Sequence, residues 1–162
     1  VIIKAPRFAS KAQIYSFINT KTDWIKKTQK KVKERGARLA TVGKLTETEL
    51  KELVAAAKEH IPERVAYFAA VGVKYGKITI RKQRSRWGSC SSAGNLSFNA
   101  LLMLAPPEVL DGVVVHELCH IKQMNHSAAF YREVSRILPD YKERNKWLKE
   151  NGHTLLERLP NY

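Results

Sequence analysis

Two histidines four residues apart, with a glutamate directly after the first, are the residues whose types and spacing point most clearly to chemistry. His116, Glu117 and His120 form an H-E-x-x-H pattern, which is typical of zinc hydrolases. On a helix the two imidazoles lie about 40° apart and one turn along the axis, so both can reach one ion. The pattern predicts a metal-binding helix.

Glu117 stands beside these ligands and is suited to act as a base. A zinc ion held by three protein ligands keeps its fourth tetrahedral position for water. A carboxylate just outside the first ligand sphere can take a proton from that water as it attacks. We therefore expect Glu117 to be the catalytic residue and one Zn²⁺, or another divalent metal, to be the cofactor.

A third histidine, His126, follows six residues after His120 and can reach the same ion. Residues 122–125 can close the helix, because Asn125 tolerates the left-handed conformation, and Ser127 can cap the next helix. A turn of this kind can bring His126 back toward the ion. We expect His126 to be the third ligand, which makes the pattern HExxH-x5-H.

Glu133, on the helix that follows, is the alternative third ligand, since some zincins use a downstream carboxylate. Metzincins have the same histidine spacing, but their pattern requires glycine where this chain has Gln123. The chain is therefore not interpreted as a metzincin.

The elements around the motif can be predicted from periodicity and caps. Pro106, Pro107 and Glu108 suit the first turn of the motif helix. The apolar run 113–115 precedes His116, and Leu118 lies about 200° from it, so the opposite face can be buried. A further helix is expected from Ser127 to Leu138, and a last one from Asp140 to Asn151 that stops at Gly152.

Upstream, residues 1–72 are expected to be mainly helical. Ser10 can cap a helix that runs to Gly36, and a capping box at residues 46–49 opens a second helix that ends near Gly72. Between these helices and the motif helix we expect a small sheet.

Short β-prone segments make up the expected strands. Residues 1–3 begin a strand that ends at Pro6, and two more strands are expected over 77–81 and 95–99. A polar loop over residues 85–94 joins the last two. The spacing predicts that they form a hairpin.

Composition places the chain among ordinary globular proteins. It has 162 residues, 44% hydrophobic, which is enough for one core, and we expect one compact unit with the boundary between an N-terminal segment, 1–72, and the hydrolase core, 73–162. No segment predicts a membrane span or signal peptide, so a cytoplasmic protein with reduced Cys90 and Cys119 and no membrane contact is expected. Because the chain opens at Val1 without an initiator methionine, we expect an upstream part to be missing.

Positive charge is concentrated in two regions. The net charge is +14; residues 1–36 hold ten Lys and Arg against two acids, and residues 81–99 hold four against none. Local basicity of this kind attracts polyanions. Contact with nucleic acid, or another polyanion, through these basic segments is one expectation, and a solvated helix face is the alternative for residues 26–33.

Several motifs taken together resemble the YgjP-like family of metal-dependent hydrolases, which is similar to the SprT and WLM groups of zincin metallopeptidases. The resemblance is dense over residues 77–152. It is carried, in chain order, by Arg86-Trp87-Gly88-Ser89-Cys90-Ser91-Ser92, Gly94-Asn95-Leu96-Ser97-Phe98-Asn99, Val114-Val115-His116-Glu117-Leu118-Cys119-His120, Asn125-His126-Ser127, Phe130 and Pro139-Asp140-Tyr141.

The resemblance implies an α+β, zincin-like fold, with a small mixed sheet packed on the H-E-x-x-H helix and further helices beside it. It implies His116, His120 and His126 as ligands and Glu117 as the catalytic residue. Members of the family are commonly described as metallopeptidases, and some as nucleoside-triphosphate pyrophosphatases that act on uridine nucleotides. The resemblance leaves the substrate open.

Four residues upstream of the motif helix are candidates for binding substrate. Arg84 and Arg86 are two apart, so on a strand they face one side and can clamp a phosphate or carboxylate; charge spread over a solvated edge strand is the alternative. Trp87 can stack on a base or serve as a core or lid residue. Asn99 can donate to an oxyanion or cap a turn.

These observations favour a zinc-dependent hydrolase, with peptide or protein as the first substrate class and nucleotide as the second. A nucleic-acid-associated protease or binding protein is the third hypothesis. A structural zinc site usually has four closed ligands, often with paired cysteines, whereas this pattern leaves one position open. The sequence therefore favours catalysis over a structural metal.

Overall fold

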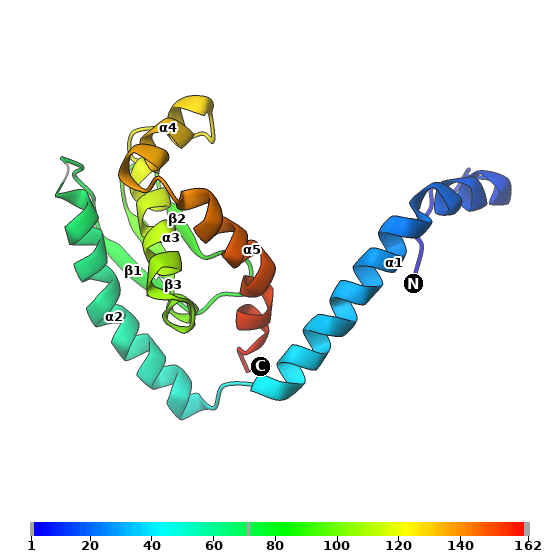
Figure 1. Cartoon of the computed structure of the whole chain (residues 1–162), viewed down its shortest axis with the longest axis horizontal. Coiled ribbons are helices and arrows are strands. Elements are labelled where there is room, and N and C mark those ends of the chain that lie inside the picture. The colour runs from blue at the N-terminus through cyan, green and yellow to red at the C-terminus, as the bar shows by residue number, and fades with distance from the viewer. Residues whose placement is uncertain (1, 71, 161–162) are drawn as a thin grey trace. The chain divides into compact units, whose positions relative to one another are not determined.

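The motif helix belongs to a small α+β unit built on three strands. The computed structural model describes residues 2–70 and 72–160 of the chain. In this part of the chain the unit follows the order α2, β1, β2, β3, η1, α3, α4 and α5 (Figure 1). Contacts within the chain group Gly43–Tyr162 as one compact unit and Val1–Val42 as another.

The first unit contains helix α1, Lys11–Val42. Ser10 begins it as predicted, because the Gln13 N–H donates to Ser10 Oγ (3.2 Å) and the Ser10 N–H donates to Gln13 Oε1 (2.9 Å). The predicted end at Gly36 is wrong: a glycine inside a helix costs only about 1 kcal/mol, and good helix formers follow it. The predicted opening strand is also wrong for Ile2 and Ile3, which lie in irregular backbone, and Val1 lies outside the described residues.

Helix α2, Glu47–Ala69, opens with the predicted capping box. The Glu49 N–H donates to Thr46 Oγ1 (3.2 Å), and the Thr46 N–H donates to the Glu49 carboxylate (2.7 Å). One face of α2 is buried in the core of the second unit. The division between the units therefore falls after Val42, whereas we expected a boundary after residue 72.

The sheet contains β1, Ile78–Arg81, β2, Gly88–Cys90, and β3, Leu96–Asn99. The strand order is β1-β3-β2, so β3 is central and β2 lies at an edge. β1 pairs with β3 in parallel, and β2 pairs with β3 antiparallel. The sheet is therefore small and mixed, as expected.

The predicted hairpin between residues 77–81 and 95–99 is wrong, because those two strands are parallel. The hairpin instead joins β3 to β2, which lies inside the predicted loop. Gly88, Ser89 and Cys90 have no apolar alternation that would mark a strand. Their conformation is set by the neighbouring strand and not by local propensity.

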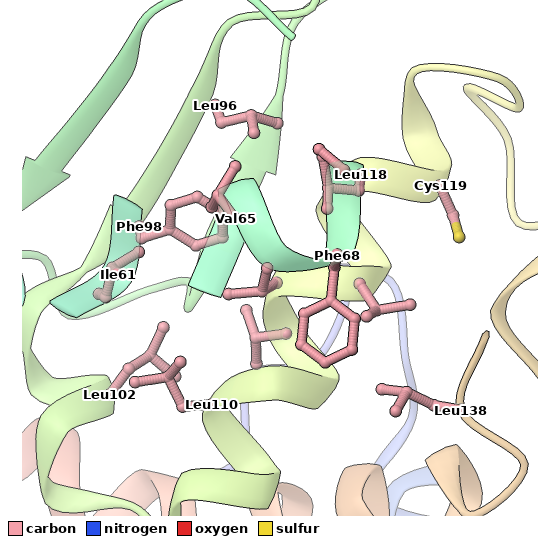
Figure 2. Close-up of a cluster of buried hydrophobic side chains, with 14 of the residues drawn as sticks. Ile61, Val65, Phe68, Leu96, Phe98, Leu102, Leu110, Leu118, Cys119 and Leu138 are labelled. Carbon is pink, nitrogen blue, oxygen red and sulfur yellow. The ribbon is translucent and has the colours of Figure 1, made fainter. Parts of the chain in front are cut away.

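The core lies between one face of the sheet and helices α2 and α3. The parallel register places Ile78 and Ile80 beside Leu96 and Phe98, so these four side chains share that face. Figure 2 shows Ile61, Val65 and Phe68 of α2 meeting the strand residues and the side chains of α3. The core fixes the back of the motif helix.

A 3₁₀ helix and three α-helices complete the unit. They are η1, Ala100–Leu104, α3, Pro107–His120, α4, Ala128–Ile137, and α5, Tyr141–Glu157. The starts of α3, α4 and α5 agree with the sequence-based prediction, while η1 was not predicted. The apolar run 113–115 and Leu118 are buried as expected.

Helix α5 continues through Gly152, so the predicted stop there is wrong. A Cβ at this position would lie 2.9 Å from Cζ2 of Trp87. The glycine is needed because an indole ring packs directly on the helix backbone. It is a packing residue and not a C-cap.

The described helices include none that is both long and apolar enough to span a bilayer. Cys90 is partly buried and Cys119 is buried, and both are free thiols.

Candidate metal centre

Three imidazoles from two neighbouring segments converge at one point. His116 and His120 lie one turn apart on α3, and His126 lies in the connection to α4. The Nε2 atom of His116 is 3.1 Å from Nε2 of His120 and 3.1 Å from Nε2 of His126. Ser127 caps α4 by accepting from the Phe130 N–H (3.3 Å), as predicted. The structure thus brings the three predicted ligands together.

Hydrogen bonds on the far side of two rings fix their orientation. Nδ1 of His120 is 3.0 Å from the carbonyl oxygen of Gln123, which can only accept, so Nδ1 carries the proton. Nδ1 of His116 lies 2.7 Å from the hydroxyl of Tyr141. With these nitrogens acting as donors, the lone pairs on both Nε2 atoms point toward the same place. This is the usual arrangement of histidines that bind a metal.

The site suits a divalent cation of zinc's kind. Candidate ligand atoms of His116, His120 and His126 all lie within 4.8 Å of one another. A tetrahedral zinc with Zn–N bonds of about 2.0–2.1 Å holds its nitrogens about 3.3 Å apart. Burial, with the charges of the other two histidines, lowers the pKa of His116 to about 4. Burial also lowers the pKa of His120, so both rings are neutral near pH 7, as ligands must be.

The ring of Phe130 in α4 packs against all three imidazole rings. Phe130 is fully buried, its ring stacks on His120 at a centroid distance of 4.5 Å, and it meets His116 edge to face at 4.9 Å. Because this phenyl ring is fixed by its own burial, it restricts the side-chain rotamers of the histidines. The residue was part of the family-like motifs in the sequence, but its position beneath the histidines was not predicted.

The side chain of Glu117 lies beside the edge strand β2. It is 5% exposed and lies against Gly88, where a Cβ would come within 2.6 Å of Oε1. Burial raises the pKa of Glu117 to about 7, while the charge of Arg86 acts in the opposite direction. A carboxyl group of this pKa is well matched to proton transfer near neutrality.

Glu133, the alternative third ligand, is engaged elsewhere. Its carboxylate lies 3.6 Å from Nζ of Lys122 and 3.3 Å from Nη2 of Arg136. These cations lower the pKa of Glu133. Among the described residues, the group able to hold a metal consists of the three histidines and does not include this carboxylate.

The two arginines expected on one strand lie instead in the loop between β1 and β2. Arg84 donates to the carbonyl oxygens of Leu159 (3.2 Å) and Pro160, so it fixes the C-terminal segment. Arg86 is exposed, and its charge lowers the pKa of Glu117. The two arginines therefore do not form the predicted clamp on one strand, and of the pair it is Arg86 whose charge affects Glu117.

Of the two alternatives predicted for Asn99, the structure shows the cap, because the residue is the N-cap of η1 and is not available to a substrate. It is fully buried. Its amide donates to the carbonyl oxygens of Gln83 (2.6 Å) and Arg86 (3.1 Å), and its Oδ1 accepts from the Leu101 N–H (3.1 Å). Asn99 thus shapes the loop that carries Arg86 and Trp87.

Trp87 lies beside His116 and Glu117. Its side chain is partly buried and lines a pocket together with His116 and Glu117. Tyr141 lines the same pocket and is the contact of His116 that the functional interpretation of the sequence missed. The only signal for it was its place in the motif Pro139-Asp140-Tyr141.

Comparison with known proteins agrees with this geometry. The sequence profile described as YgjP-like, metallopeptidase domain, matches residues 44–151. No curated protein matches the chain significantly.

The solved structures that resemble the chain include two metallopeptidase zymogens. The metallopeptidase zymogen of Pyrococcus abyssi abylysin has a TM-score of 0.50 at 21% identity, over 56% of this chain and 93% of that one. The zymogen of Methanocaldococcus jannaschii jannalysin has a TM-score of 0.48 at 21% identity, over 57% and 96%. At 21% identity, the similarity to the abylysin zymogen concerns the fold alone. It confirms the expected α+β, zincin-like architecture.

Proposed function

This chain belongs to the YgjP-like family of metallopeptidase domains, and from this premise we propose that it is a zinc-dependent peptidase whose metal is held by His116, His120 and His126. The family supports a metal-dependent hydrolase. The assignment of zinc, of the ligands and of Glu117 as the base is our proposal.

One observation carries it. The Nε2 atoms of His120 and His126 each lie 3.1 Å from Nε2 of His116. The next residue after His116 is a buried carboxyl with a pKa raised to about 7. Neutral imidazoles that face each other in this way are stabilised by a cation between them. A buried acid beside them serves little structural purpose but is suited to moving a proton.

A zinc ion bound here would supply a polarised water and a Lewis acid for the substrate carbonyl. Glu117 accepts the proton of the attacking water on its carboxylate and can return it to the leaving amine. Gly88 leaves room for that carboxylate beside β2. Because β2 is an edge strand in contact with α3, its free backbone groups can align an extended peptide by main-chain hydrogen bonds.

Nucleoside-triphosphate pyrophosphatase activity is the second candidate. It is favoured by the charge of Arg86 near Glu117 and by a polar depression on the sheet that Arg86 shares with Arg81 and hydroxyl side chains. Arginine side chains are frequent partners of phosphate. We place the peptidase first because the chain belongs to a family of metallopeptidase domains.

Metal removal and replacement test the proposal. The protein is stripped with a chelator and reloaded with zinc, and each form is incubated with an unstructured protein and with a panel of nucleoside triphosphates. We expect cleavage of the protein to disappear on stripping and return with one equivalent of zinc. Zinc-dependent release of pyrophosphate, without proteolysis, would instead establish the second candidate.

A further inference from the structure

A pocket of about 170 Å³ opens beside the proposed catalytic residues. One side is formed by His116 and Glu117 of α3, and the opposite side by α5. Its apolar lining comes from Trp87, Val109, Val113 and Leu148. A peptide with its scissile bond at Glu117 therefore brings a neighbouring side chain to the mouth of this pocket.

The walls of the pocket are fixed by close packing. The indole of Trp87 lies on the backbone of Gly152, where a Cβ would come within 2.9 Å of the ring. On the other side, Gly112 of α3 leaves room for the aliphatic part of Arg144, whose Cβ would be 3.2 Å from a Cβ at residue 112. The pocket is thus formed before any ligand arrives, as binding pockets usually are.

The charged group at the pocket is already neutralised. Nε of Arg144 donates to Asp140 Oδ1 (2.9 Å), and Nη1 donates to the carbonyl oxygen of Glu108 (2.7 Å). The hydroxyl of Tyr141 is likewise engaged with His116 (2.7 Å). An acidic side chain would find no unpaired cation among these described residues, and a basic one would pair with the proposed base, Glu117.

We propose that this pocket is the specificity pocket of the peptidase and takes an apolar side chain of the substrate adjacent to the scissile bond. The proposal rests on the proposed function. It names the substrate class: peptides with a medium-sized aliphatic or aromatic residue at that position. An acidic side chain is unfavourable there because no unpaired cation would compensate its desolvation. A basic one is unfavourable because its pairing with Glu117 would occupy the proposed base. Each buried methylene of an apolar side chain instead adds to binding.

The preference for particular residues next to the scissile bond is called the position preference. It is measured by digesting a pool of unstructured peptides with the zinc-loaded protein and sequencing the cleavage sites. Glu117→Gln protein in parallel excludes contaminating peptidases. We expect one position next to the scissile bond to be enriched in leucine, isoleucine, valine, methionine and phenylalanine and depleted in charged residues.

Variants of Leu148 assign that preference to the pocket. Leu148→Phe narrows it and is expected to lower kcat/KM about tenfold for peptides with a large apolar residue at the selected position, relative to alanine there. Leu148→Ala widens it and shifts the preference toward phenylalanine and tryptophan. Leu155→Ala, the same change on the same helix outside the pocket lining, leaves the preference as in the wild type.

The outcomes separate the two proposals. Glu117-dependent cleavage without a position preference, or with one that neither Leu148 variant alters, overturns the pocket assignment and leaves the peptidase standing. Absence of Glu117-dependent cleavage of any peptide overturns both. Glu117-dependent nucleotide hydrolysis that the Leu148 variants change would show that the pocket takes a base and not a side chain.

Discussion

At the scale of single residues, the contact between Tyr141 and His116 links helix α5 to the proposed metal ligands. The phenol is buried and lies 2.7 Å from Nδ1 of the imidazole. A partner on the far nitrogen restricts the orientation of the ring. We therefore expect Tyr141 to act as a positioning residue for the proposed metal centre.

Tyr141→Phe is expected to weaken zinc binding by about 10–100-fold, because His116 loses the partner that orients it. Affinity is measured by competition with a chromophoric chelator. Tyr131→Phe is the matched control, since that ring faces His126 at 6.3 Å and is 45% exposed. Equal affinities for the Tyr141→Phe and wild-type proteins would show that the hydrogen bond does not position the ligand.

Gly88 is the second residue on which the account depends. In Gly88→Ala the new methyl group would lie 2.6 Å from Oε1 of Glu117 and displace the carboxylate. Misplacement of a catalytic group by about 1 Å costs roughly 100-fold in rate, so kcat should fall by about that factor while zinc content is unchanged. Gly36→Ala, which meets open space in α1, should leave kcat as it was. An undiminished kcat in Gly88→Ala would place the working carboxylate elsewhere.

At the scale of elements, helices were predicted better than strands. Local signals set helix starts: the capping box at Thr46, the hydroxyl of Ser127 and the proline pair before α3 could all be recognised from the sequence and are present in the structure. The parallel pairing of β1 and β3 depends on contacts far apart in sequence. No local pattern encodes it, so the hairpin was assigned to the wrong pair.

The same distinction applies within the site. The H-E-x-x-H spacing is a property of one helix, and His116 and His120 were identified from it. His126 was predicted from the helix-closing and capping signals that follow the motif. The contacts of Glu117 with Gly88 and of His116 with Tyr141 join separate elements. The failed stop at Gly152 has the same origin, because only the fold reveals that Trp87 packs there.

Helix α2 belongs to the core of the metallopeptidase unit, although the sequence-based boundary separated it. Val65 of this helix is fully buried. Val65→Ala should lower the free energy of unfolding by roughly 1.5–3 kcal/mol, measured by urea denaturation. Val32→Ala on the exposed surface of α1 (56% exposed) should change it by no more than about 0.5 kcal/mol. A Val65→Ala protein as stable as the wild type would contradict this placement.

At the scale of the whole molecule, the site is contained in one unit. All residues assigned a role in metal binding or catalysis lie in Gly43–Tyr162, and the family profile begins at residue 44. Units with their own core can fold independently. The other unit holds most of the net positive charge of the chain, with eleven Lys and Arg against two acids over residues 1–42.

A fragment of residues 43–162 is therefore expected to unfold cooperatively, to bind one equivalent of zinc and to retain the peptidase activity of the full chain. Circular dichroism during heating and zinc titration provide the measurement. A fragment without a cooperative transition would show that the N-terminal unit is needed for the fold of the second one.

The most direct test of the central claim compares hydrolysis of an unstructured protein by wild-type and Glu117→Gln proteins that hold equal amounts of zinc. The account predicts unchanged zinc affinity in the variant and a loss of turnover of roughly 100- to 10,000-fold, the usual contribution of a general base. Turnover near the wild-type rate in a zinc-loaded Glu117→Gln protein would contradict the assignment of Glu117 and, with it, the proposed catalytic centre.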